Sequence, residues 1–173
     1  MANNVKENDY RYGENVNKRK STASAILIGI GLAGLIDIII FHAILQWHHT
    51  SSHIIIPNTI ESLQMNLLHD GLFLSFSLII TIAGVILLWH ASSSNNKDSL
   101  LSNKRPFIGL SLIGFGGFNT IEGIINHLVL EMHHVIDVAN PLAFDLAFLV
   151  VGGLAFLAAG GLLLRSGKAQ LKP

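Results

Sequence analysis

The sequence contains no cysteine among its 173 residues, and only 13% of the residues are charged. The lack of cysteine excludes disulfide bonds, thiolate metal sites and iron–sulfur clusters held by this chain. Any transition metal must therefore bind His, Asp, Glu, Met or backbone atoms. An ordinary soluble domain carries about 25% charged residues. Together with a hydrophobic content of 50%, the low charge indicates a membrane protein.

Four long apolar runs account for most of the chain, at roughly residues 24–46, 63–89, 106–130 and 142–164. Each run meets the requirement of about 20 residues for a helix that crosses the hydrocarbon. Because unpaired backbone groups are costly in lipid, each run should be α-helical. The sequence therefore predicts an all-α polytopic membrane protein, a four-helix transmembrane bundle over residues 24–164. Polar residues 1–23 predict a disordered cytoplasmic tail, residues 91–105 a flexible linker and residues 165–173 a second cytoplasmic tail.

Lysine and arginine are missing from residues 47–62 and 131–141, which join the apolar runs in pairs. All 11 basic residues lie before the first run, between the second and third, or after the fourth. The positive-inside rule therefore predicts a multi-pass protein of the bacterial plasma membrane with both termini in the cytoplasm. No basic face is left over for nucleic acid. The lipid bilayer is the one partner implied, and neither a respiratory-chain partner nor an oligomeric state is identified.

A polar pattern occurs twice, 85 positions apart. The shift superimposes Gly29 on Gly114, Gly31 on Gly116, Asp37 on Glu122, His42 on His127, and His48 and His49 on His133 and His134. Three histidines and an acid in register are not expected from chance matching of apolar helices. The second helices match more weakly, with Asp70 opposite Asp145. We therefore predict two parallel-repeat helical hairpins, at about residues 24–90 and 106–164, related by a pseudo-two-fold axis along the membrane normal.

The phrases "FHAILQWHH", "LHDG", "EGIINH" and "HHVID" resemble the bacterial four-helix membrane proteins grouped as domain-of-unknown-function family 2243. The resemblance extends from about residue 25 to residue 164. One departure is Ile38, where a glycine commonly follows the aspartate. The resemblance implies the four-helix fold and draws attention to the histidine and acidic positions, but it names no substrate.

Histidine and aspartate side chains gather just beneath the predicted outer surface. With Trp47 as the interfacial marker, a rise of 1.5 Å per residue places His42 about 7 Å and Asp37 about 15 Å inside the membrane. Residues of the other three helices enter to a similar depth as His42. The candidate metal ligands are His42, His127, His69, Asp70, Asp145, His49 and His134.

Regular helices would hold these ligands at two levels. His42 and His49 share a face but lie about 10 Å apart, too far for bonds of about 2 Å to one ion. The sequence thus predicts a deeper level around His42 and His127 and an outer level around His49 and His134. The intramembrane acids Asp37 and Glu122 would point about 140° away from His42 and His127.

The two intramembrane acids would share their face with His48 and His133 instead, eleven residues further along each helix. No lysine or arginine is available at their depth. An isolated carboxylate there is costly. We therefore predict that Asp37 and Glu122 form a coupled pair with at least one proton near neutral pH.

Three functions fit these residues, and they leave open whether the protein is an enzyme. The first is a transition-metal site of Cu, Zn or Fe, for binding, delivery or a metal-dependent redox role. The second is a non-covalent haem b electron carrier with His42 and His127 as axial ligands. The third is a proton or ion pathway through Asp37 and Glu122.

Structural roles compete with each of these functions. The outer histidines would suit an interfacial belt, His42 and His127 could join helices by hydrogen bonds, and Asp70 and Asp145 could sit near helix N-termini. Close helix packing is predicted for the glycines Gly29, Gly31, Gly34, Gly114, Gly116 and Gly117.

Overall fold

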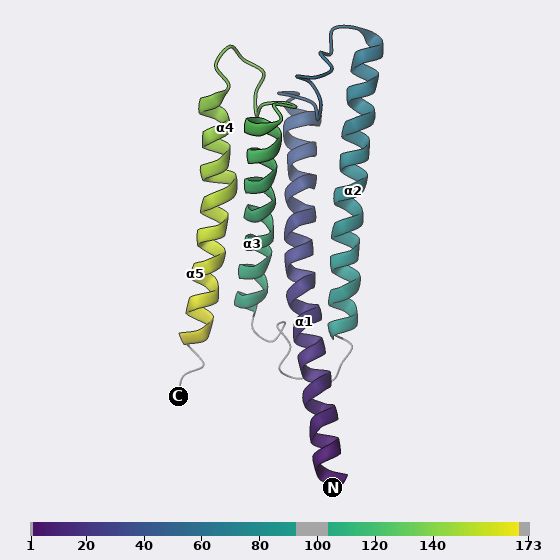
Figure 1. Ribbon diagram of the computed structural model, residues 1–173, viewed down its shortest axis with the longest axis vertical. Helices are drawn as coiled ribbons and strands as arrows, with labels where there is room; N and C mark the ends of the chain where they lie inside the picture. Colours follow the sequence, from purple (N-terminus) through teal and green to yellow (C-terminus); the bar gives the residue numbers. More distant parts are fainter. Residues whose placement is uncertain (1, 93–103, 170–173) are drawn as a thin grey trace.

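The computed structural model describes residues 2–92 and 104–169, which form four long helical rods (Figure 1). Three of the rods contain a stretch of π-helix, in which each hydrogen bond spans one more residue than in an α-helix. The elements are α1 (Ala2–Asp37), η1 (Ile38–Ile44), α2 (Ile60–Ser92), α3 (Lys104–Glu122), η2 (Gly123–Val129), α4 (Leu142–Phe148), η3 (Leu149–Leu154) and α5 (Ala155–Ala169). The rods are therefore α1–η1, α2, α3–η2 and α4–η3–α5.

All four rods are long and apolar enough to cross a membrane, over Arg11–Ile44, Ile60–Ser92, Lys104–Val129 and Leu142–Ser166. Large apolar side chains cover their outer faces, and Leu72, Ile79 and Val151 are each at least 60% exposed. Such faces suit contact with lipid. The buried side chains include many polar ones, since Asn66 and Asp145 are among the most enclosed. The predicted all-α, four-helix membrane fold is confirmed.

The rods lie in the order α2, α1, α3 and α5 across the molecule (Figure 1). Helix α1 packs against α2 and α3, and α3 packs against α1 and α5, so α1 and α3 form the centre. The start of α1 and the end of α5 lie at the same end of the bundle (Figure 1). The two long loops, residues 45–59 and 130–141, lie at the opposite end, which we call the loop end.

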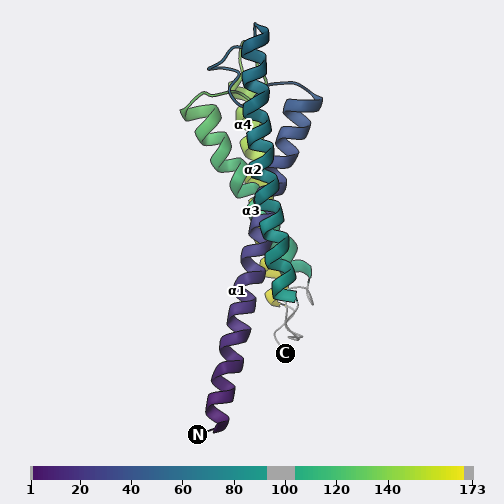
Figure 2. The same cartoon turned by 90° about the vertical axis from the view of Figure 1, so that its right-hand side faces the viewer.

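Helices α1 and α3 cross through two glycines that correspond under the 85-residue shift. A Cβ atom at Gly29 would collide with the carbonyl oxygen of Ser111, and one at Gly114 would collide with that of Ile26. Only glycine permits this approach of two backbones. Beyond the crossing, α1 and α3 diverge toward the loop end (Figure 2). The divergence makes room for the two loops to fold back between them.

Two sequence-based expectations differ from the observed elements. Close packing is confirmed at Gly29 and Gly114 but is wrong for Gly117, because a Cβ there would meet nothing within 4 Å. Residues 1–23 were expected to be a disordered tail, whereas α1 begins at Ala2. Adding residues to an existing helix costs little because each one gains a hydrogen bond, so the long apolar helix can continue into a polar segment.

Two other expected segments are the second cytoplasmic tail and the linker between the hairpins. Helix α5 extends to Ala169, into the segment expected to be the second tail. Most of the expected linker, residues 93–103, lies outside the described residues.

Candidate functional site

The π-helical stretches bring each intramembrane acid onto a histidine of its own helix. In η1, Asp37 Oδ2 lies 3.3 Å from His42 Nε2. In η2, Glu122 Oε1 lies 3.4 Å from His127 Nε2. Side chains five residues apart face the same way in a π-helix, because its hydrogen bonds join residues five apart. The expectation that the acids point away from these histidines, based on α-helical geometry, is therefore wrong.

Both loops begin at a residue in the left-handed backbone conformation. Gln46 has φ 51° and Glu131 has φ 47°, and these are the two positive-φ residues other than glycine in the described part of the chain. The backbone N–H of Trp47 then bonds to Phe41, and that of Met132 bonds to Asn126, at 2.9 and 2.8 Å. The chain reverses at these caps, so the following histidines return toward the bundle.

This reversal removes the predicted separation into two levels. His42 Nδ1 lies 2.9 Å from Asp70 Oδ1, and His49 Nδ1 lies 2.7 Å from Asp70 Oδ2. One aspartate thus contacts two histidines that a continuous helix would place about 10 Å apart. The prediction of a deeper and an outer level is wrong because the helices end at Ile44 and Val129.

Asp70 and Asp145 each hold a loop in place. Asp70 also accepts hydrogen bonds from the backbone N–H and the hydroxyl of Thr50, at 2.9 and 2.8 Å. Asp145 accepts bonds from His134 at 2.8 Å and from the backbone N–H of Val135 at 2.9 Å. Val135 lies 85 positions after Thr50, so the two halves use the same backbone contact. Each aspartate therefore fixes the loop that carries a pair of histidines.

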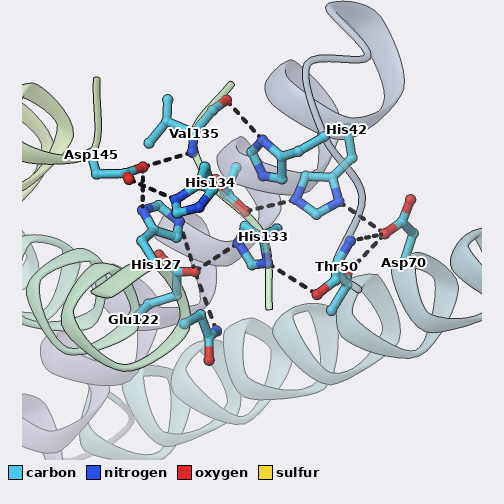
Figure 3. A network of polar contacts seen from close by, with 12 residues as sticks. His42, Thr50, Asp70, Glu122, His127, His133, His134, Val135 and Asp145 are labelled. Carbon is cyan, nitrogen blue, oxygen red and sulfur yellow. Dashed lines mark hydrogen bonds and ion pairs between the residues drawn. The ribbon is translucent and has the colours of Figure 1, made fainter. Parts of the chain in front are cut away.

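Four imidazole rings form a compact quartet at the loop end, and Figure 3 labels three of them, His42, His127 and His133. The rings contact one another in the order His42, His48, His133 and His127, with successive centroids 4.3, 4.6 and 4.8 Å apart. The quartet is bent, since His42 also lies 6.0 Å from His133 and His48 lies 6.4 Å from His127. The middle rings, His48 and His133, are stacked with only 4° between their planes. All four side chains are buried, with exposed fractions of 2–3%.

Each middle ring donates a hydrogen bond to the loop of the other half. His48 Nδ1 lies 2.9 Å from the carbonyl oxygen of Val135, and His133 Nδ1 lies 3.0 Å from that of Thr50. A carbonyl can only accept, so both Nδ1 atoms carry hydrogen. Burial, aided by repulsion from His133 and His42, lowers the pKa of His48 to about 2. His48 is therefore a neutral ring whose Nε2 has a free lone pair.

Two matching clusters result, each with one carboxylate and two imidazoles. The first contains Asp37, His42 and His48, and the second contains Glu122, His127 and His133. In each cluster one ligand atom from each residue lies within 4.8 Å of the others. A third group with the same property, His42, His49 and Asp70, shares His42 with the first. These groups are the candidate metal centre.

Comparison with known proteins identifies the family. A family model described as "Predicted membrane protein (DUF2243)" matches residues 24–167, which is most of the chain. The chain belongs to this family. No curated protein and no solved structure matches it at a significant level. The DUF2243 match spans all four rods, and it therefore supports the membrane fold without assigning a role to the histidines.

In this DUF2243 chain the predicted site residues reach different places. His42, His49 and Asp70 come together, and so do His127, His134 and Asp145, with His127 Nδ1 at 3.4 Å from Asp145. His69 does not join them, because it lies on the side of α2 that faces Ser51, with Nδ1 at 2.9 Å from the hydroxyl.

The predicted coupling of Asp37 with Glu122 stays a prediction, and each acid contacts histidines. Glu122 Oε1 lies 3.2 Å from His133 Nε2 as well as near His127. The ligands predicted from the sequence include His49 and His134 but not His48 and His133, which complete the two clusters. Their position eleven residues after each acid was the available signal.

Proposed function

We propose that the protein binds transition-metal ions at the loop end of the bundle, one at Asp37, His42 and His48 and one at Glu122, His127 and His133. The distribution of lysine and arginine supports placing this end on the outer side of a bacterial plasma membrane. Contacts that recur at an offset of 85 residues support a duplicated site.

The observation that carries the proposal is the direction of the histidine hydrogen bonds. In His42, His48 and His133, the Nδ1 atom contacts an acceptor, either Asp70 or a backbone carbonyl. A neutral ring whose Nδ1 carries the hydrogen keeps an unprotonated Nε2. Metal-bound histidines have this arrangement, in which one ring nitrogen donates to a carboxylate or carbonyl and the other binds the ion.

Three of the ring nitrogens in the two clusters make no hydrogen bond of their own. Nε2 of His42 and of His48 are buried and lack a hydrogen bond within the described part of the chain, as does Nδ1 of His127. His42 Nε2 faces Asp37, and His133 Nε2 faces Glu122. A lone pair that faces a carboxylate oxygen is repelled unless a proton or a cation lies between them. A metal ion would take the place of that proton in both contacts.

The charge of the region supports the same proposal. Asp37, Asp70, Glu122 and Asp145 are all buried, with exposed fractions of 8% or less. The sequence has no lysine or arginine between residues 21 and 96 or between residues 106 and 164. Buried carboxylates need a counter-charge, and divalent ions would supply it.

The geometry needs only a small contraction. Ligand atoms bound to one ion at about 2.1 Å lie about 3.4 Å apart in a tetrahedral site. The atoms of each cluster lie within 4.8 Å of one another. Movements of about 1 Å would close each site. Two imidazoles and one carboxylate leave a coordination position open, as in metal sites that act on a bound molecule.

A haem is less compatible with this arrangement. Axial coordination by His42 and His127 would require a porphyrin between them. The stacked rings of His48 and His133 each lie within 6.4 Å of both of these histidines and leave no space for it. An ion pathway through Asp37 and Glu122 is also less well supported, since both acids contact histidines at the loop end.

Elemental analysis of the detergent-purified protein tests the proposal. We expect up to two equivalents of a transition metal, one lost in His48→Ala and the other in His133→Ala. His90→Ala is the matched control, because His90 is exposed near the opposite end of α2. A Soret band would indicate haem instead. A folded His42→Ala, His127→Ala double variant that retains all the metal of the parent would refute the assignment.

A further inference from the structure

An apolar pocket lies beside the second cluster, between α1, α2 and α3. It has a volume of about 470 Å³, and its walls include the rings of Phe73, Phe76 and Phe118. Glu122 and Asn126 provide its polar side chains. The pocket lies within the membrane-spanning stretches, so an occupant would enter from the lipid. Its size and its few polar groups are typical of small-molecule sites.

A related pocket of about 360 Å³ lies between α1, α3 and the α4–η3–α5 rod, and Asp37 lines it. Asp37 and Glu122 correspond under the 85-residue shift, so each cluster has a pocket that reaches its acid. The first pocket is larger, and Gly117 contributes to that space because a Cβ there would meet nothing within 4 Å. The corresponding residue in the first half is Leu32.

The polar groups of the larger pocket distinguish it from a groove for an acyl chain. Within the described residues, the contacts of Glu122 with Asn126, His127 and His133 all use Oε1. Oε2 is therefore available to a molecule in the pocket. Asn126 donates its Nδ2 to Glu122 at 3.3 Å, which leaves its carbonyl oxygen as a second acceptor. An acyl chain has no donor for either group.

We propose that this pocket binds a lipid-soluble quinol, a flat dihydroxy ring with an apolar tail. One ring hydroxyl donates to Glu122 Oε2 and the ring lies against Phe73 and Phe118, which are stacked with centroids 6.1 Å apart. The quinol binds better than the quinone, because a carboxylate accepts hydrogen bonds and the oxidised ring has no hydroxyl to donate. The proposal goes beyond metal binding and does not depend on it, since the pocket is formed by protein side chains alone.

Isothermal titration of the full chain in phospholipid nanodiscs with a short-tailed benzoquinol tests this binding. Gly117→Leu fills the pocket with the side chain found at position 32, and we expect the affinity to fall at least tenfold. Gly161→Leu is the matched control, because a Cβ at Gly161 also meets nothing within 4 Å and Gly161 does not line this pocket. We expect unchanged affinity in this control. Glu122→Gln should weaken binding about tenfold, the effect of losing a hydrogen bond to a charged group.

Two results would overturn the proposal. One is quinol binding that Gly117→Leu leaves unchanged. The other is displacement of the quinol, at equal concentration, by a saturated alcohol with the same tail and no ring, which would show an acyl-chain groove. Metal content measured on the same samples separates this proposal from the previous one. Protein without metal that binds the quinol refutes only the metal site, and metal-loaded protein without quinol binding refutes only the pocket.

Discussion

Exchanging the two residues that correspond between the loops tests the equivalence of the two halves. Thr50 and Val135 have nearly the same shape, and the backbone N–H of each donates to an aspartate at 2.9 Å. They differ in the Thr50 hydroxyl, which donates to Asp70 at 2.8 Å. Thr50→Val should therefore remove one hydrogen bond without creating a cavity.

The expected magnitude follows from the chemistry of that bond. Hydrogen bonds to charged groups contribute about 1.5–3 kcal/mol. Thr50 is only half-buried, so we expect Thr50→Val to reduce the free energy of unfolding by about 1–2 kcal/mol. Val135→Thr should add the missing bond to Asp145 and stabilise the protein by up to about 1 kcal/mol. The two effects should add, because the residues contact different aspartates.

Unfolding of the metal-free protein by sodium dodecyl sulfate, followed by circular dichroism, measures both variants and the double variant. Metal must be removed first, since an ion bound only to the folded state would add its own stabilisation. Two outcomes would refute the reasoning. One is a change below about 0.3 kcal/mol in Thr50→Val, and the other is destabilisation by more than about 1 kcal/mol in Val135→Thr.

Three further predictions concern the crossing, the caps and the buried histidine quartet. Gly29→Ala should destabilise the protein by more than about 2 kcal/mol in the same assay, because its Cβ meets the carbonyl of Ser111, whereas Gly117→Ala should change little. Gln46→Gly should raise the melting temperature, with a gain of about 0.5–1 kcal/mol, because φ is 51° there, and Gln46→Ala should not. Unfolded His48 binds a proton below its ordinary pKa of 6.5, and the folded side chain does so only near a pKa of about 2. The contribution of His48 to the stability of the metal-free protein should therefore be constant above pH 6.5 and fall below it, by roughly 1 kcal/mol per pH unit, and the difference in unfolding free energy between the parent and His48→Gln measures this slope.

The fold could be predicted from the sequence because the bilayer restricts the choice of structure. A run of 20 or more apolar residues has to form a helix in lipid. The absence of lysine and arginine from the two loops predicted that both loops lie on the same side, and this indicated which helices form hairpins. Crossing points could be anticipated at Gly29 and Gly114, since both fall in the recurring pattern. The helical state of residues 2–23 could not be predicted, because their polar composition is equally compatible with a tail.

The candidate site could be predicted only in part. The 85-residue offset related His42 to His127 and Asp37 to Glu122, and both pairs lie at the site. The arrangement within each half was wrong, because a rotation of 100° per residue does not apply in η1 and η2. Gln46 and Glu131 gave no signal of a left-handed cap, a position that usually takes glycine or asparagine. These two local departures from α-helix bring His48 and His133 into the bundle.

The reciprocal bonds of His48 and His133 have a consequence for assembly. Each ring donates to a carbonyl supplied by the other hairpin, so a single hairpin presents an unpaired histidine and an unpaired carbonyl. Two hairpins expressed as separate polypeptides should therefore recognise each other and rebuild the histidine quartet without a covalent connection. The same geometry would let one hairpin form a symmetric homodimer, with a true two-fold axis passing between the stacked rings.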